Sequence, residues 1–154
     1  MGLFDRFKRS QKHTGIYESF STWLDKHLSR DLPDGIVGIN FNLYDGFLVD
    51  AAGKPMKDLE SYDVELVGCN RFDENDSDWA YHEVFNTRED LFRISKKSVP
   101  HSNDIPFLEQ ELSFFTTLAT RYLNEGKYAD KLKSFTAIAI GHVSGDLVVL
   151  HRNK

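Results

Sequence analysis

One stretch in the second half of the chain repeats apolar residues with the period of an α-helix. The repeat positions are spaced four, three, four and three residues apart: Leu108, Leu112, Phe115, Ala119 and Tyr122. This spacing places them on a single face of a helix. Asp104 is expected to cap its start, Pro106 fits its first turn, and Gly126 is expected to end it in the left-handed conformation. A long helix with one apolar face must pack on another layer of structure.

A second helix is predicted near the N-terminus. Its apolar positions follow the same three-and-four spacing from Ile16 to Leu28, and Pro33 and Gly35 prevent continuation beyond about Arg30. The polar residues 10–14 are interpreted as a short linker. Residues 127–133, after the long helix, are expected to form a short extra helix or an ordered turn.

Two strands are predicted between the helices. Residues 35–44 and 61–70 alternate apolar and polar side chains, the pattern of a strand with two different faces. Asp45-Gly46 is a strong turn signal, and residues 51–57 are interpreted as a loop. These features predict an antiparallel pair with a long connection. A third short strand is expected at 91–94, whereas 79–85 fits either a strand or a helical turn.

The chain closes with a predicted hairpin. Residues 135–143 and 146–151 flank Ser144-Gly145, a tight-turn sequence. Its apolar character on both faces predicts a central position in the sheet. One face carries only small residues, on which a helix is expected to lie: Ala137, Ala139 and Gly141.

The order helix, strands, long helix, strands predicts an α+β fold. The expected sheet is largely antiparallel, has four or more strands, carries both helices on one face and ends in the hairpin. We expect one domain over residues 15–154, preceded by a flexible or docking N-terminal arm, residues 1–14.

Composition and motifs exclude several classes of function. The net charge of −5 disfavours nucleic-acid binding. Cys69 is the only cysteine, so no internal disulfide forms and a cytoplasmic location is expected. No apolar run is long enough to span a membrane. The sequence contains no nucleotide-binding motif, and we expect no cofactor and no metal.

The acidic segment, residues 73–78, is the most unusual local feature of the sequence. Asp73, Asn75 and Ser77 match the first positions of a calcium loop, but Asp78 replaces the required glycine and Val84 replaces the closing glutamate. Two interpretations remain: a solvated turn with side chains bonded to its own backbone, or a patch that faces a protein partner. The predicted partner-binding residues are Asp73, Glu74, Asp76, Asp78, Trp79 and Tyr81.

Several segments together resemble a group of small uncharacterised bacterial α+β proteins, some of which look like immunity proteins of toxin systems. The resemblance spans residues 16–152 and is carried by residues 39–44, 65–73, 78–80, 83–85 and 125–133. It implies direct binding of a cognate toxin, and it assigns no functional residue.

The first hypothesis is therefore a non-enzymatic immunity protein that neutralises a basic toxin domain, with Trp79 or Tyr81 as an anchor. One alternative is a structural or regulatory subunit that docks through its N-terminal arm. The other is a small enzyme whose site is not visible in the sequence, with Glu65, His82 and Glu83 as acid/base candidates.

Overall fold

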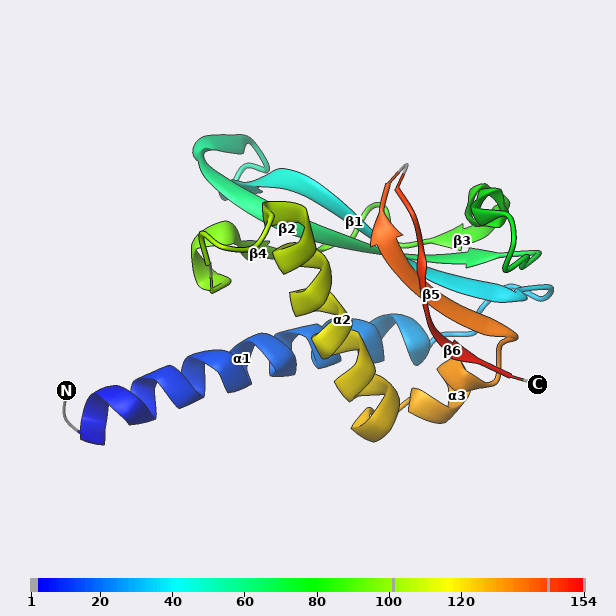
Figure 1. Ribbon diagram of the computed structural model, residues 1–154, viewed down its shortest axis with the longest axis horizontal. Helices are drawn as coiled ribbons and strands as arrows, with labels where there is room; N and C mark the ends of the chain where they lie inside the picture. The colour runs from blue at the N-terminus through cyan, green and yellow to red at the C-terminus, as the bar shows by residue number, and fades with distance from the viewer. Residues whose placement is uncertain (1–2, 101, 144, 154) are drawn as a thin grey trace.

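The computed structural model describes residues 3–100, 102–143 and 145–153, and for residues 3–14 it describes the backbone alone. Two long helices and a curved sheet dominate the molecule (Figure 1). The elements follow one another as α1 (Leu3–Leu28), β1 (Gly38–Val49), β2 (Pro55–Cys69), the 3-10 helix η1 (Ser77–Tyr81), β3 (Glu83–Asn86), β4 (Phe92–Ser95), the 3-10 helix η2 (Lys96–Ser98), α2 (Phe107–Glu125), α3 (Ala129–Lys133), β5 (Ala137–His142) and β6 (Val148–Arg152).

The six strands form one sheet in the order β3-β2-β1-β5-β6, with β4 also paired to β2. Four pairings are antiparallel, and the pairing of β1 with β5 is parallel. The predicted α+β class and largely antiparallel sheet are confirmed. Strand β5 lies inside the sheet, but β6 is an edge strand, so the predicted central position holds for only half of the final hairpin.

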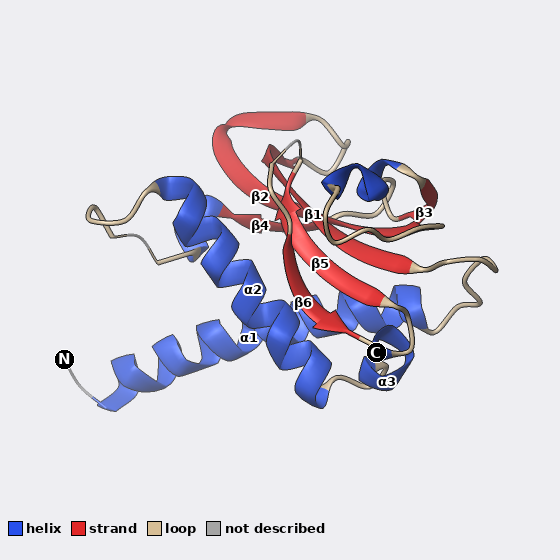
Figure 2. Ribbon diagram, turned by 45° about the vertical axis from the view of Figure 1, so that its right-hand side comes forward, coloured by secondary structure: helices blue, strands red, loops and turns tan. Residues whose placement is uncertain are grey.

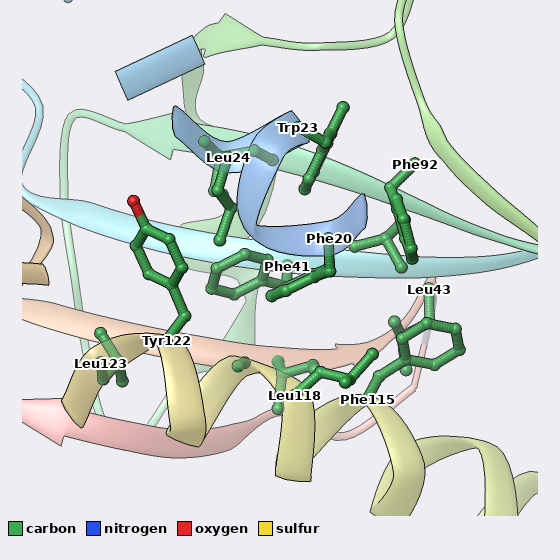
Figure 3. Close-up of a cluster of buried hydrophobic side chains, with 14 of the residues drawn as sticks. Phe20, Trp23, Leu24, Phe41, Leu43, Phe92, Phe115, Leu118, Tyr122 and Leu123 are labelled. Carbon is green, nitrogen blue, oxygen red and sulfur yellow. The ribbon is translucent and has the colours of Figure 1, made fainter. Parts of the chain in front are cut away.

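Helices α1 and α2 cover the same face of the sheet (Figure 2). Alternation along β1 turns Ile39, Phe41 and Leu43 toward the helices, and β5 contributes Ile138 and Ile140. Figure 3 shows the resulting aromatic-rich cluster between the strands, α1 and α2, with these labelled members: Phe20, Trp23, Leu24, Phe41, Leu43, Phe92, Phe115, Leu118, Tyr122 and Leu123. Burial of these large side chains is the main source of stability.

The prediction of a turn at Asp45-Gly46 is wrong. Asp45 pairs with Tyr62 and Gly46 with Ser61, and the chain reverses at residues 50–54 instead. There the Asp50 carboxylate accepts bonds from the Ala52 and Lys54 amides. Gly46 serves another purpose, because a Cβ at this position would clash with Oδ2 of Asp63.

The predicted linker at residues 10–14 is also wrong, since α1 is continuous from Leu3. The first turns of the helix extend beyond the rest of the molecule (Figure 1). The predicted docking role of the N-terminal arm stays a prediction, because it depends on side chains that lie outside the described part of the chain. In that described part, no helix has the length and apolar character of a membrane span.

The buried stripe of α2 is confirmed at Phe115, Ala119 and Tyr122, whereas Leu112 is only partly buried and Leu108, at the start of the helix, is exposed. The ends of α2 also differ from prediction. Pro106 precedes the helix, and no side chain caps it, so Asp104 is not the cap. Gly126 is extended, with φ −70°, and not left-handed. Its lack of a side chain matters because the Tyr122 ring lies where a Cβ would stand. The short helix predicted within residues 127–133 is present as α3.

The small-residue face of β5 does not receive α1 or α2, and the helix that packs there through Trp79 is the short 3-10 helix η1. Ala139 packs instead with Val67, Cys69 and Trp79 on the opposite side of the sheet from α1 and α2. A Cβ at Gly141 would lie 2.6 Å from the Asp146 carbonyl oxygen, because the chain between β5 and β6 folds back across this face. Ser144, the first residue of the predicted tight turn, lies outside the described residues.

Candidate functional site

The face of the sheet opposite the helices is polar at its centre. Alternation in β1 puts Asn40, Asn42 and Tyr44 on this face, and β2 adds Asp63 and Glu65. Asn40 and Glu65 are fully buried, although both are strongly polar. Buried polar groups of this kind are tolerated only when other groups satisfy them.

Glu65 is the centre of a side-chain network. Its Oε1 accepts a bond from Tyr44 Oη at 2.7 Å and one from Asn42 Nδ2 at 3.1 Å, and its Oε2 accepts one from Arg88 Nε at 2.9 Å. Burial, followed by the bond to Glu65, raises the pKa of Tyr44 to about 12. Hydrogen bonds to Glu83 and the charge of Glu65 raise the pKa of Arg88 further above its ordinary value. The Glu65 carboxylate is thus held on both oxygens.

The network continues from Asn42 to Asn40 and ends there. Asn40 Nδ2 donates to Asn42 Oδ1. The remaining amide atom of Asn40, Oδ1, is buried and has no hydrogen-bond partner among the described residues. An unpaired buried acceptor costs about 1–3 kcal/mol, a cost that a hydrogen-bond donor from water or from a ligand would remove.

A hollow of about 290 Å³ lies over this part of the sheet. Strand β1 supplies Asn40, Asn42 and Tyr44, and the rest of the lining comes from the η1–β3 region, Arg88 and the β5–β6 connection: Ser77, Asp78, Ala80, Tyr81, Glu83, Arg88, His142, Val143, Gly145, Asp146 and Leu147. Segments more than 100 residues apart along the chain therefore border one concavity.

The charge of this hollow is predominantly negative. Asp78, Glu83 and Asp146 line it, whereas Arg88 is the one lysine or arginine in the described lining. Both Glu83 oxygens accept bonds from Arg88 Nη2, at 3.0 and 3.1 Å. Across the described part of the chain, no side-chain ion pair involves Asp78 or Asp146. Two carboxylates are consequently available to a ligand.

Trp79 fixes η1 to the sheet. Its indole lies against Gly38 and meets the Phe72 ring edge-on, with ring centroids 5.2 Å apart. The side chain is 4% exposed, so it anchors the segment internally and offers almost no surface to a partner. Of the two aromatic anchors that the sequence suggested, Tyr81 alone is accessible, at 65% exposed.

The acidic segment is exposed and ordered by its own side chains. Asp73 Oδ1 accepts a bond from the Asn75 amide, and Asp76 Oδ1 accepts one from the Asp78 amide. These are the self-bonded turns expected for Asx residues. Glu74 pairs with Arg152 of β6. Of the predicted partner-binding residues, Asp78 and Tyr81 border the hollow, while Asp73, Glu74 and Asp76 lie on the exposed segment leading to it.

The acid/base candidates of the enzyme alternative are only partly assembled. Glu65 and Glu83 approach the same guanidinium, that of Arg88. His82 is exposed and is not among the described lining of the hollow. The Glu65 carboxylate accepts from three donors, which leaves it poorly placed to remove a proton from a substrate.

A second polar group lies on the helix side of the sheet. Glu111 of α2 is fully buried, and neither of its oxygens has a hydrogen-bond partner in the described chain. The His142 ring lies beside it, with Nδ1 3.7 Å from Oε2. Burial, followed by the negative charge of Asp45, raises the pKa of Glu111 to about 8. The charge of Asp63 acts in the same direction, and the positive charge of Lys96 acts in the opposite one.

Sequence reasoning missed Asn40, Asn42, Tyr44, Arg88 and Asp146. The signal was the pair of asparagines in an otherwise apolar strand, which was interpreted as an ordinary polar face. Among the described residues, no cluster of three or more His, Cys, Asp or Glu side chains is arranged to hold a metal ion. Comparisons with protein families, curated proteins and solved structures found no match to this chain. The resemblance to immunity proteins stays a prediction.

Proposed function

We propose that this protein is a non-enzymatic binding protein, and most specifically an immunity protein that neutralises a basic toxin domain in the cytoplasm by direct contact. The observation that carries the proposal is that the acidic segment reaches the hollow: Asp78 belongs to both, and the nearby Tyr81 also lines the hollow. The resemblance of the sequence to immunity proteins supplies the class of partner.

The proposed binding surface consists of residues 73–78, Tyr81 and the hollow. Its exposed carboxylates attract a basic partner and speed association. Tyr81 provides a large, exposed ring beside the concavity, and such aromatic residues concentrate binding energy in interfaces. Since Trp79 is internal, the contact is made by Tyr81 and the carboxylates around it.

Rigidity of the surface supports the same role. The segment is tied down by Trp79, by the Asx bonds of Asp73 and Asp76, and by the Glu74–Arg152 pair. A surface held in its binding shape loses less conformational entropy on association. The enzyme alternative has no comparable support, because Glu65 is already fully bonded.

The test is capture followed by neutralisation. The immobilised protein is exposed to lysate of its source organism at low and high salt, and any retained basic protein is expressed alone and together with this chain. We expect the retained protein to arrest growth and co-expression to restore it. Retention should fall at high salt, because attraction between exposed charges is screened.

Matched variants locate the surface. Asp76→Lys and Tyr81→Ala should each reduce retention at least tenfold, whereas Asp58→Lys, an equal charge reversal at the far end of β2, should not. Equal retention by all three variants would exclude this surface. A retained protein that is harmless when expressed alone would exclude the immunity function.

A further inference from the structure

We infer that the hollow is a receptor for one cationic nitrogen group, an ammonium or a guanidinium, carried by the partner as a lysine or arginine side chain. Only the source of the cation rests on the proposed function. The pocket itself is argued from the orientation of its hydrogen bonds and from its charge.

The direction of the network is set by Glu65. An ionised carboxylate only accepts hydrogen bonds, so Asn42 must present its amide nitrogen to Glu65. This leaves Asn42 Oδ1 to accept from Asn40, which must in turn present its own nitrogen. Asn40 Oδ1, the last atom of this hydrogen-bond network, is therefore an acceptor. Rotating the Asn40 amide cannot place a donor at this position.

This acceptor lies on the face of the sheet that forms the floor of the hollow. Asn40 lines the hollow, is fully buried, and has its Oδ1 unpaired within the described residues. Its neighbours in β1, Ile39 and Phe41, face the helices, so the Asn40 amide lies on the opposite side. A ligand that enters the hollow and donates a hydrogen bond would remove the cost of this unpaired group.

The carboxylates around the hollow favour a donor that carries a positive charge. Asp78 from η1 and Asp146 from the β5–β6 connection line the hollow from different segments, and neither is neutralised by an ion pair in the described chain. Arg88 is the one lysine or arginine of the described lining, and Glu65 and Glu83 already engage it. Bonds between a cationic donor and a carboxylate are about twice as strong as neutral ones. An anion would meet two free carboxylates, and a neutral donor would leave their charges uncompensated.

The size of the hollow suits a side-chain head group. Its volume of about 290 Å³ lies near the lower end of the range for small-ligand pockets. Tyr81 is largely exposed and borders the hollow. It can cover the aliphatic stem or the charged end of an entering side chain, in the manner of a cation–π contact.

The test uses methylguanidinium and methylammonium as probes, with N-methylurea as the neutral control of similar size. Each is titrated into the ¹⁵N-labelled full chain, and the side-chain amide signals of Asn40 and Asn42 and the Arg88 Nε–H signal are followed. We expect saturable shifts of these signals with at least one cation in the millimolar range. N-methylurea should bind at least tenfold more weakly.

Variants that remove carboxylates distinguish cation binding in the hollow from general attraction to the acidic protein. Asp78→Asn combined with Asp146→Asn should weaken cation binding at least tenfold, and Asp58→Asn should leave it unchanged, with the backbone spectrum confirming the fold of each variant. Equal binding of N-methylurea, or the absence of saturable shifts in the folded wild-type protein, would overturn the inference.

The two proposals fail in different ways. Cation binding without any retained partner would reject the immunity function and keep the pocket. Partner retention that depends on Asp76 and Tyr81, with no cation binding, would keep the binding surface and reject the pocket. Loss of both cation binding and retention in the Asp78→Asn, Asp146→Asn variant would support the two together.

Discussion

The indole of Trp79 lies directly on the backbone of Gly38, so that a Cβ at residue 38 would stand 2.6 Å from Cζ3 of the ring. This contact holds η1, and with it Asp78 and Tyr81, against the first residue of β1. We therefore expect Gly38→Ala to displace the ring and lower the free energy of unfolding by about 1–3 kcal/mol, the usual cost of overpacking.

The measurement is denaturant unfolding followed by tryptophan fluorescence. Gly15→Ala is the matched control, since nothing lies within 4 Å of a Cβ at this helical position. It should raise stability by about 0.5–1 kcal/mol, as expected for alanine in place of glycine inside a helix. Equal stability of the two variants would show that Trp79 yields to the added methyl group.

Glu111 predicts a pH dependence of stability. Its pKa in the folded protein, about 8, exceeds the ordinary value of 4.5. The folded state thus binds the proton more tightly than the unfolded state. The contribution is fully present below about pH 4.5 and is lost as pH rises toward 8.

We expect Glu111→Gln to abolish this loss, so that the variant gains stability relative to wild type between pH 5 and 8. Each unit of pKa difference corresponds to about 1.4 kcal/mol, giving a relative gain of a few kcal/mol. Urea unfolding across this range measures it. A constant difference between the two proteins at all pH values would contradict the prediction.

The Glu65–Arg88 pair should contribute more to the free energy of unfolding than an ordinary surface ion pair. The reason is that Glu65 is fully buried, although Arg88 remains 56% exposed. Arg88→Ala leaves the buried carboxylate without its charged donor. A hydrogen bond to a charged group contributes about 1.5–3 kcal/mol. Solvent screening at Arg88 lowers our expectation to about 1–2 kcal/mol.

Lys133→Ala is the control for this comparison, because Lys133 and Asp130 form an exposed pair on α3. Its removal should cost less than about 1 kcal/mol. Both variants are compared with wild type by thermal and denaturant unfolding. Adding Glu65→Gln to Arg88→Ala should recover part of the loss, and a further drop would instead show that Asn42 and Tyr44 require the charge.

Cys69 is expected to be inert in the folded protein. The thiol is fully buried, and burial raises its pKa to about 12. Since the thiolate is the reactive form, DTNB at pH 8 should label it only as fast as the chain unfolds. Labelling should be immediate in guanidinium chloride. Rapid labelling of the native protein would contradict the packing of Cys69 with Trp79 and Ala139.

Much of the fold followed from local patterns in the sequence. The alternation of apolar and polar residues identified the two faces of the strands, and the apolar stripe that ends at Tyr122 identified α2. Both patterns arise because burying one face of an element requires apolar residues at regular positions along it. The turn at Asp45-Gly46 was mispredicted for a tertiary reason: Gly46 makes room for the Asp63 carboxylate, which pairs with Arg93.

That error also hides the site. Asn42 lies opposite Glu65 only in the register fixed by the reversal at residues 50–54. A turn at residues 45–46 would pair different residues, and a shift in register changes which side chains meet. Asp146 reaches the hollow through the β1–β5 pairing, which links distant parts of the chain and leaves no local signal. The acidic segment was visible in the sequence, whereas the groups beside it were not.

The parallel pairing of β1 with β5 has a consequence for how the protein is made. It joins residue 38 to residue 137, so one long edge of β1 stays open during synthesis until β5 has emerged from the ribosome. Pairings between such distant residues form slowly, and open strand edges invite association with other chains. Asp146 also lines the hollow, so a nascent or truncated chain ending before β5 has neither a closed sheet nor a complete hollow.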